Sequence, residues 1–255
     1  MKIITLNTWG GRAGKEGLLS FFKEHADDTD IFCLQEVWSA PYHHIEGHAA
    51  GGLAIDHSQV MTYGLQEITA VLSGHTPYFH PHHLDNYGLL LLVKKDLIAA
   101  DHGEVFVHKH KGFIPEGDVG HHARNVQYVT LKTDAGPLTV GNFHGLWNGK
   151  GKTDSPDRLN QSKNILKWAE ERDGEVILCG DFNLLPDTES IKMLEDAGLK
   201  NLIREFDVRS TRTSHYTKPE KYADYVFHSE GVNVKNFYVL TDEVSDHAPL
   251  ALEIL

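Results

Sequence analysis

The sequence predicts an α/β fold, because short apolar runs typical of strands alternate along the chain with longer stretches of helical periodicity. The run DIFCLQEV at 30–37 is apolar almost throughout, as in strands that are buried on both faces. The stretch 155–172 has a clear helix start, with Ser155 in the cap position and Pro156 at the first helical position. No repeat or linker divides the 255 residues, so we predict a single catalytic domain over residues 1–255.

The other elements follow from the same patterns in chain order. KIITLN (2–7) is strand-like and KEGLLSFFKEHA (15–26) is an amphipathic helix; GPLTVGNFH (136–144) follows a Gly-Pro turn, and TESIKMLEDAG (188–198) is a helix that Gly198 closes. Residues 41–87, apart from a helical patch near 58–72, and residues 108–123 are rich in histidine and glycine and are expected to form irregular binding loops or lids. Further strands are expected at 88–96, 104–110, 125–133, 175–183, 222–229, 232–240 and 248–255.

The charge balance limits the class of partner. The chain has 24 Lys and Arg against 36 Asp and Glu, a formal charge of -12, which argues against tight, non-specific nucleic-acid binding. Cys33 and Cys179 lie inside apolar runs and are expected to be buried and free. No apolar stretch approaches the ~20 residues of a membrane span, and the first strand leaves no room for a leader, so a reduced, cytoplasmic setting is expected.

Polar residues stand at the ends of the predicted strands. In a mixed sheet, the ends of strands that run one way share a rim with the starts of strands that run the other way. Taken singly, an Asp or Asn at such a place is more often a turn former, and a His is more often structural. Carboxylates and a carboxamide together suit a hard cation such as Mg²⁺, and histidines titrate near neutral pH. We therefore expect eight side chains to converge on one mouth: Asn7, Glu36, His144, Asp181, Asn183, Asp224, Asp246 and His247.

Six motifs occur in the order seen in the endonuclease/exonuclease/phosphatase superfamily: LNTWG, LQEVW, NFHG, GDFN, ADYVF and SDH. The chain resembles this superfamily from residue 3 to 255. The resemblance implies a four-layered α/β sandwich, in which two mixed, mostly antiparallel β-sheets pack face to face with helices outside. It also implies a metal-dependent phosphoric ester hydrolase that uses Mg²⁺ (or Mn²⁺) and in-line attack of an activated water.

The resemblance also implies roles for the residues at the metal and at the water. Glu36 is the principal metal ligand, with Asn7 beside it, and Asp246 lies close to the metal. Asp181 orients or deprotonates the attacking water, and Asn183 hydrogen-bonds the phosphoryl oxygens.

For the remaining residues, the resemblance implies contacts with the phosphate and the leaving group. His247 contacts the phosphate and is held by Asp224, while His144 protonates the leaving oxygen. Arg124 and Tyr87 are weaker matches to phosphate-contacting positions, and a purely structural role is given equal weight for both.

The natural substrate stays open between a nucleic acid and a soluble or lipid headgroup phosphodiester. Low basicity argues against a processive DNA enzyme, whereas Trp9, Trp38 and Trp147 near the expected rim could stack a base or cover a ligand. The chain is expected to act as a monomer on its phosphate-ester substrate.

Other classes of protein compete with a phosphoesterase as interpretations of the sequence. An inactive binding scaffold of the same fold is the alternative function, although such a protein would be expected to have lost some of the central residues. The segment 43–83 is expected to be a solvent-exposed loop, with a Zn²⁺ site as its alternative. WGGRAGKE and LWNGKGKT lack the first glycine of a P-loop, which excludes that type of nucleotide binder.

Overall fold

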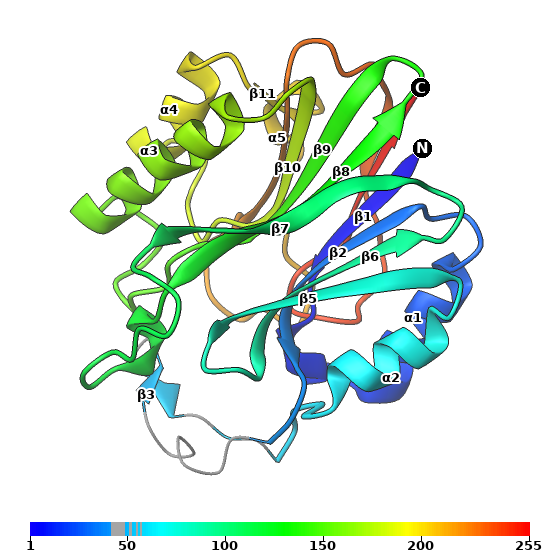
Figure 1. The fold of residues 1–255 in the computed structure, drawn as a ribbon. Coiled ribbons are helices and arrows are strands. Elements are labelled where there is room, and N and C mark those ends of the chain that lie inside the picture. The colour runs from blue at the N-terminus through cyan, green and yellow to red at the C-terminus, as the bar shows by residue number, and fades with distance from the viewer. Residues whose placement is uncertain (42–48, 51–52, 55, 57) are drawn as a thin grey trace.

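Two six-stranded mixed sheets pack face to face in the computed structural model, which describes residues 1–41, 49–50, 53–54, 56 and 58–255 (Figure 1). The first sheet has the order β13 (Val234–Val239), β14 (Leu250–Ile254), β1 (Lys2–Asn7), β2 (Ile31–Trp38), β6 (Tyr87–Lys94) and β5 (His75–His83). The second has the order β11 (Lys200–Asn201), β12 (Asp224–His228), β10 (Glu175–Asp181), β9 (Gly136–His144), β8 (Arg124–Thr133) and β7 (Ala99–His108).

Helices cover the outer face of each sheet and complete four layers (Figure 1). The first sheet is covered by α1 (Lys15–His25) and α2 (Gly64–Val71), and the second by α3 (Pro156–Glu170) and α4 (Glu189–Asp196). The shorter elements are η1 (Trp9–Gly11), β3 (Ala49–Ala50), β4 (Leu53–Ala54), η3 (Val119–His121) and α5 (Leu202–Glu205). The predicted four-layered sandwich is therefore confirmed. None of the described helices is long and apolar enough to span a membrane.

Each sheet contains one parallel strand pair at its centre, and each pair comes from a strand–helix–strand unit. In the first sheet, β1 and β2 are parallel and α1 connects them; in the second, β9 and β10 are parallel and α3 connects them. All other pairings within the two sheets are antiparallel. Because the carboxyl ends of parallel strands meet at one edge, each unit delivers two strand ends to a common rim.

The space between the sheets holds the main apolar core, to which β2 contributes Ile31 and Cys33 and β10 contributes Ile177 and Cys179. Both cysteines are free and buried, as predicted. A second apolar cluster, with Phe22 at its centre, fills the space between the first sheet and the helices α1 and α2.

A buried polar ladder crosses the core next to the common rim. Gln35 on β2 donates to Asn142 Oδ1 on β9 at 2.7 Å, and Asn142 donates to Gln127 Oε1 on β8 at 3.0 Å. Asn142 also donates to the backbone carbonyl of Leu34 at 3.0 Å. Buried amides stabilise a fold only when they are satisfied, so these bonds fix the register of one sheet on the other.

The histidine-rich segment differs from expectation in part. Residues 75–83 form the edge strand β5, and His75, His82 and His83 are buried rather than solvent-exposed. Alternating histidine and proline conceals this strand in the sequence, whereas its pairing with the apolar strand β6 stabilises it. The rest of the expected loop falls partly on residues 42–48, 51–52, 55 and 57, outside the described residues.

Candidate active site

The two parallel strand pairs bring four polar side chains together at the common rim. Asn7 and Glu36 come from the carboxyl ends of β1 and β2, and His144 and Asp181 end β9 and β10. The amide of Asn7 bridges the two sheets, because its Nδ2 donates to Glu36 Oε1 at 3.1 Å and to Asp181 Oδ2 at 3.0 Å. The convergence expected from strand ends is thus present in the structure.

Glu36 is turned into the site by an irregularity in its strand. The pairing of β2 with β6 shifts register between Leu34 and Val37, and Glu36 has a φ of 58°. A bulge re-aims the side chain at its position, and a left-handed conformation costs a non-glycine residue ~1–3 kcal/mol. Burial raises the pKa of Glu36, and the opposing effects of the Arg12 guanidinium and of the Asn7 hydrogen bond do not offset it. The strained carboxylate is the kind of group that a bound cation would stabilise.

Asp181 lies at the centre of the site. Its Oδ2 is 3.7 Å from His144 Nε2 and 3.6 Å from His247 Nε2, while its Oδ1 accepts from the backbone N–H of Asn183 at 2.8 Å. Burial alone would raise the pKa of Asp181, but the positive charges of His247 and Lys152 outweigh it and hold the pKa far below its ordinary value. Asp181 is therefore an ionised carboxylate.

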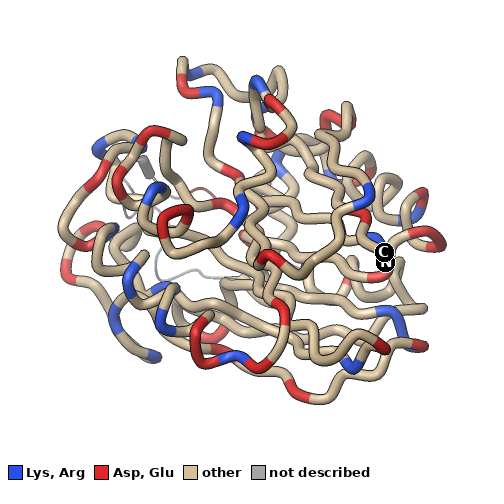
Figure 2. The backbone as a smooth tube through the Cα atoms, turned by 90° about the horizontal axis from the view of Figure 1, so that it is seen from above, with Lys and Arg blue, Asp and Glu red and all other residues tan. Residues whose placement is uncertain are grey.

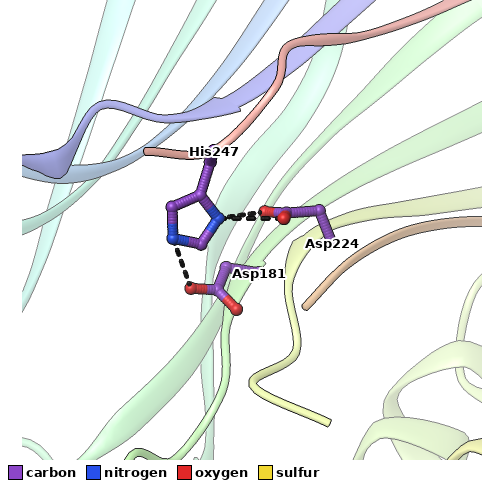
Figure 3. A group of neighbouring side chains, drawn as sticks. All are labelled: Asp181, Asp224 and His247. Atoms are coloured by element: carbon purple, nitrogen blue, oxygen red, sulfur yellow. Dashed lines mark hydrogen bonds and ion pairs between the residues drawn. The ribbon is translucent and has the colours of Figure 1, made fainter. Parts of the chain in front are cut away.

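Asp224 holds His247 from behind. His247 Nδ1 lies 2.8 and 2.9 Å from the two carboxylate oxygens of Asp224 (Figure 3). Thr211 Oγ1 donates to Asp224 at 2.9 Å. This contact places the Nδ1 proton toward Asp224 and leaves Nε2 facing Asp181. Burial and Arg212 lower the pKa of His247, but the carboxylates Asp224, Asp246 and Asp181 outweigh them and raise it above its ordinary value.

His144 has the opposite electrostatic environment. Burial, reinforced by the guanidinium of Arg124, lowers its pKa well below the ordinary value. Its Nδ1 is buried and has no hydrogen-bond partner among the described residues. The two site histidines are thus distinguished by their surroundings, with His247 favoured as a cation and His144 as a neutral imidazole.

Asn183 is held in place by Lys152, a residue that the sequence analysis missed. Lys152 Nζ donates to Asn183 Oδ1 at 2.7 Å, and Asn183 Nδ2 donates to the carbonyl of Gly145 at 3.2 Å. Asn183 has a φ of 55°, a conformation that Asn tolerates better than most residues. The only signal for Lys152 in the sequence is the glycine-rich loop directly after His144.

Asp246 forms an ion pair with Arg212, a second residue that the sequence analysis missed. Arg212 Nη1 lies 3.1 Å from Asp246 Oδ2, and the guanidinium stacks on Tyr216 with its centre 4.0 Å from the ring centroid. Asp246 Oδ1 is buried without a hydrogen-bond partner among the described residues and lies 3.7 Å from His247 Nε2. Arg212 lies outside the named strands, in an isolated antiparallel β-bridge with His247, so no periodic run of residues indicated it.

Arg124 and Tyr87, the two weaker candidates, also line the site. Arg124 is only 1% exposed, and its Nε and Nη1 have no hydrogen-bond partner in the described part of the chain. Its Nη2 donates to the carbonyl of Gly120 at 3.2 Å. Tyr87 packs on Trp38 with ring centroids 4.7 Å apart. A buried guanidinium with unpaired nitrogens is costly, so this position is suited to an incoming anion.

A stack of histidines forms one wall of the site and was not expected from the sequence. The ring of His122 stacks between His82 and His83, with centroids 4.9 and 4.8 Å away. Burial holds the pKa of His82 and His122 well below the ordinary value, so these rings are neutral. The rings of His82 and His122 therefore contribute aromatic surface rather than charge.

These side chains line a pocket of about 400 Å³, which Trp9, Trp38 and Trp147 also border, as predicted. Six of the eight strand-end residues line the pocket, and a seventh, Asn7, donates hydrogen bonds to two of these six, Glu36 and Asp181. The eighth, Asp224, supports His247 from outside the lining.

The lining of the pocket carries an excess of two positive charges, although the whole chain has a formal charge of -12. The basic residues of the lining are Arg12, Arg124, Lys152, Arg212 and Lys218, and the acidic residues are Glu36, Asp181 and Asp246.

The donor groups fit a hard divalent cation. Glu36 and Asp246 offer carboxylate oxygens, and the buried Oδ1 of Asp246 has no hydrogen-bond partner among the described residues. Asn7 lies beside Glu36, with its Nδ2 donating to Glu36 and its Oδ1 accepting from the backbone N–H of Trp9 at 2.9 Å. A second grouping, of Asp181, Asp224 and His247, brings ligand atoms within 4.8 Å of one another. There, however, His247 and Asp224 already satisfy each other, so we favour the oxygen donors around Glu36.

Comparison with known proteins agrees with this fold. The model of the Endonuclease/Exonuclease/phosphatase family matches residues 4–247. No curated protein sequence matches the chain.

Solved structures that are similar over the whole chain include the following three. A conserved protein of unknown function from Enterococcus faecalis has a TM-score of 0.74 at 21% identity, with 100% of this chain and 99% of that chain covered. A mannosyl-6-phosphatase from Bacteroides thetaiotaomicron has a TM-score of 0.73 at 17% identity, with 100% and 99% covered. The human Nocturnin catalytic domain, with a bound sulfate anion, has a TM-score of 0.62 at 17% identity, with 100% and 93% covered. These likenesses show the fold, and the family match over most of its length shows that the chain belongs to the endonuclease/exonuclease/phosphatase family of phosphoric ester hydrolases.

Proposed function

We propose that this protein is a divalent-metal-dependent phosphodiesterase that hydrolyses a phosphate ester by in-line attack of water. One observation carries the proposal: an ionised Asp181 lies within 3.7 Å of two histidine Nε2 atoms with opposite electrostatic environments, inside a pocket of net positive lining. Carboxylate, imidazolium and neutral imidazole around one point provide the acid–base groups that phosphoryl transfer uses.

In this proposal, Asp181 positions the nucleophile. The attacking water donates a hydrogen bond to the Asp181 carboxylate, which takes up the proton as the water oxygen bonds to phosphorus. The bond from phosphorus to the leaving oxygen breaks in the same displacement. The very low pKa of Asp181 makes it a weak base, so its main contribution is orientation of the water.

The two histidines stabilise the negative charge that develops on the phosphoryl oxygens and on the leaving oxygen. His247, kept protonated by Asp224, donates a hydrogen bond from Nε2 to a phosphoryl oxygen. We assign neutral His144 to the leaving oxygen as a hydrogen-bond donor through Nε2, and that oxygen takes its proton from solvent. The unpaired Nε and Nη1 of Arg124 support a contact with the phosphate or the group next to it, with Tyr87 packed alongside.

The residues that would hold the cation are Glu36, Asn7 and Asp246. When bound, Mg²⁺ or Mn²⁺ would neutralise negative charge on the phosphoryl group and lower the pKa of coordinated water. Asn7 links this group to Asp181 through its two hydrogen bonds, and its backbone carbonyl accepts from Ser245 Oγ at 2.7 Å. These contacts would hold the cation and the attacking water at a fixed position relative to each other.

A small phosphate ester suits the pocket better than a long nucleic acid. Basic and acidic positions are interspersed along the described backbone, without a continuous basic stretch for a phosphate backbone to follow (Figure 2). The positive charge is gathered inside the pocket instead. The similar mannosyl-6-phosphatase acts on a sugar phosphate, so monoesters belong in the screen beside diesters. Nucleic acid stays the alternative substrate.

We treat residues 1–255 as one catalytic domain that acts as a monomer in the cytoplasm, in keeping with its two free, buried cysteines. An inactive scaffold is disfavoured because all eight expected side chains are retained around the pocket.

Hydrolysis by the purified protein tests the proposal directly. After chelation, the protein is assayed with and without Mg²⁺ on bis(p-nitrophenyl) phosphate, p-nitrophenyl phosphate, plasmid, an oligonucleotide, sphingomyelin and phosphoinositides. We expect metal-restored turnover on at least one ester and a loss of ~10²-fold or more in Asp181→Asn. A wild-type protein inert on the whole panel, or an Asp181→Asn variant with full turnover, would contradict the proposal.

A further inference from the structure

Lys152 is a buried cation that the strand-end pattern does not predict. Its side chain lines the pocket and the residue is 3% exposed, a burial that lysine almost never shows without a paired charge. One N–H of its ammonium donates to Asn183 Oδ1 at 2.7 Å. Among the described residues no carboxylate lies within 4.0 Å of Nζ, and no other acceptor takes its two remaining N–H groups.

The loop that carries Lys152 is fixed by another buried cation. Arg158 on α3 donates to the carbonyls of Leu146, Gly151 and Thr153, which lie on both sides of Lys152. The carbonyl of Lys152 itself accepts from the backbone N–H of Leu185 at 2.8 Å. The backbone around Lys152 is thus fixed by hydrogen bonds on several sides, and this fixed backbone directs the ammonium into the pocket.

The surroundings of the ammonium point to an anionic ligand. Its charged neighbours are Asp181 on β10, Asp224 on β12, Arg158 on α3 and Arg212, and Lys218 shares with it the ring of Trp147. Lys152 Nζ lies 5.2 Å from the Trp147 ring centroid. A buried ammonium that donates only one hydrogen bond, to a neutral amide, is costly until a negative group accepts its remaining N–H groups.

We propose that Lys152 is a further catalytic residue, which together with Asn183 binds the phosphoryl oxygens and offsets the negative charge of the transition state. This inference rests on the proposed phosphoesterase function. Lys152 keeps its three protons throughout, while the water oxygen bonds to phosphorus, the water proton passes to Asp181 and the bond to the leaving oxygen breaks. A fixed cation aimed at developing charge costs no reorganisation during the reaction.

Two substitutions test this role on bis(p-nitrophenyl) phosphate with Mg²⁺. Lys152→Met keeps the length of the side chain without its charge, and we expect kcat to fall ~10²-fold. Lys152→Arg restores a cation and should recover part of that loss. Lys150→Met, an exposed lysine on the same loop, is the matched control and should retain wild-type kcat. Circular dichroism checks that each variant is folded.

The pH profile separates a catalytic cation from a structural one. Burial lowers the pKa of Lys152 to about 8, so the ammonium is lost as the pH rises through that value. The kcat/KM of the wild type should therefore decline above about pH 8, because kcat/KM follows the ionisation of the free enzyme. In Lys152→Arg the decline should be absent at the same pH, since arginine does not titrate in this range.

The outcomes separate failure of the inference from failure of the proposed function. Wild-type kcat in Lys152→Met, or the same alkaline decline in Lys152→Arg, overturns the role of Lys152 and leaves the phosphoesterase intact. If the wild type is inert on every ester, the proposed function fails first. Binding of inorganic phosphate, measured by titration calorimetry, then decides on Lys152: ~10-fold weaker binding in Lys152→Met supports the anion contact, and equal binding overturns it.

Discussion

Replacing Lys152 by Met should make the protein more stable, while it lowers activity. The pKa of Lys152 falls from 10.5 to about 8 on burial, a difference that corresponds to about 3 kcal/mol of free energy lost at neutral pH. Met removes this cost, but it also leaves Asn183 Oδ1 without its donor, which costs ~1–3 kcal/mol. The net expectation is a gain of up to ~2 kcal/mol in the free energy of unfolding.

The gain should depend on pH in a defined direction. Between about pH 8 and 10.5 the unfolded wild type binds a proton at Lys152 that the folded form has lost, so wild-type stability rises with pH over this window. Lys152→Met lacks this contribution. Its advantage over the wild type should therefore be largest at pH 7 and should shrink by up to about 3 kcal/mol by pH 10.5.

Urea denaturation in a chelating buffer measures both effects, with wild type and Lys152→Met compared at pH 7 and pH 10. Lys150→Met again serves as the control and should match the wild type at both values. A Lys152→Met protein that is less stable at pH 7, or a difference that stays constant between the two pH values, would refute the reasoning. Higher stability with lower activity is typical of a residue kept for function.

Three further predictions concern the support of the site. Asp224→Asn removes the negative charge that holds His247, so kcat on the chromogenic diester should fall ~10²-fold without loss of fold; unchanged turnover would contradict this. Gly180→Ala should unfold far more readily than Gly198→Ala. Both glycines have a positive φ, but a Cβ at residue 180 would lie 2.0 Å from the carbonyl oxygen of Phe143, whereas a Cβ at residue 198 would meet no atom within 4 Å. Equal urea midpoints of the two variants would contradict this prediction. Asn142→Leu breaks the ladder between the sheets and should lower the free energy of unfolding by ~3 kcal/mol or more, and a midpoint within error of the wild type would contradict this.

The residues that sequence reasoning found share one physical property, which is that they end or begin strands. Runs of apolar residues reveal strands, and the polar residue that closes each run is visible without any tertiary information. Asn7, Glu36 and Asp181 were accessible in this way, and the family resemblance supplied their order. The parallel pairs then bring these ends to one rim.

The residues that it missed depend on contacts far away in the chain. Lys152 and Arg212 lie outside the named strands and helices, where a basic residue is ordinarily solvated. The burial of Lys152 depends on the loop that Arg158 fixes, and the burial of Arg212 depends on its ion pair with Asp246. The strand β5 was missed because its alternating histidines and prolines mimic an irregular segment. Tertiary pairing overrides local propensity at such places.

The hydrogen bonds of Asn7 across the rim have a consequence for how the protein could lose activity. Half of the reactive groups belong to one layer and half to the other, so chemistry requires the two layers to be docked within a fraction of an ångström. A partly separated sandwich would keep most of its strands and still be inert. Turnover is therefore a more sensitive gauge of correct assembly than secondary structure, and inactivation on gentle warming should come before any loss of strand signal.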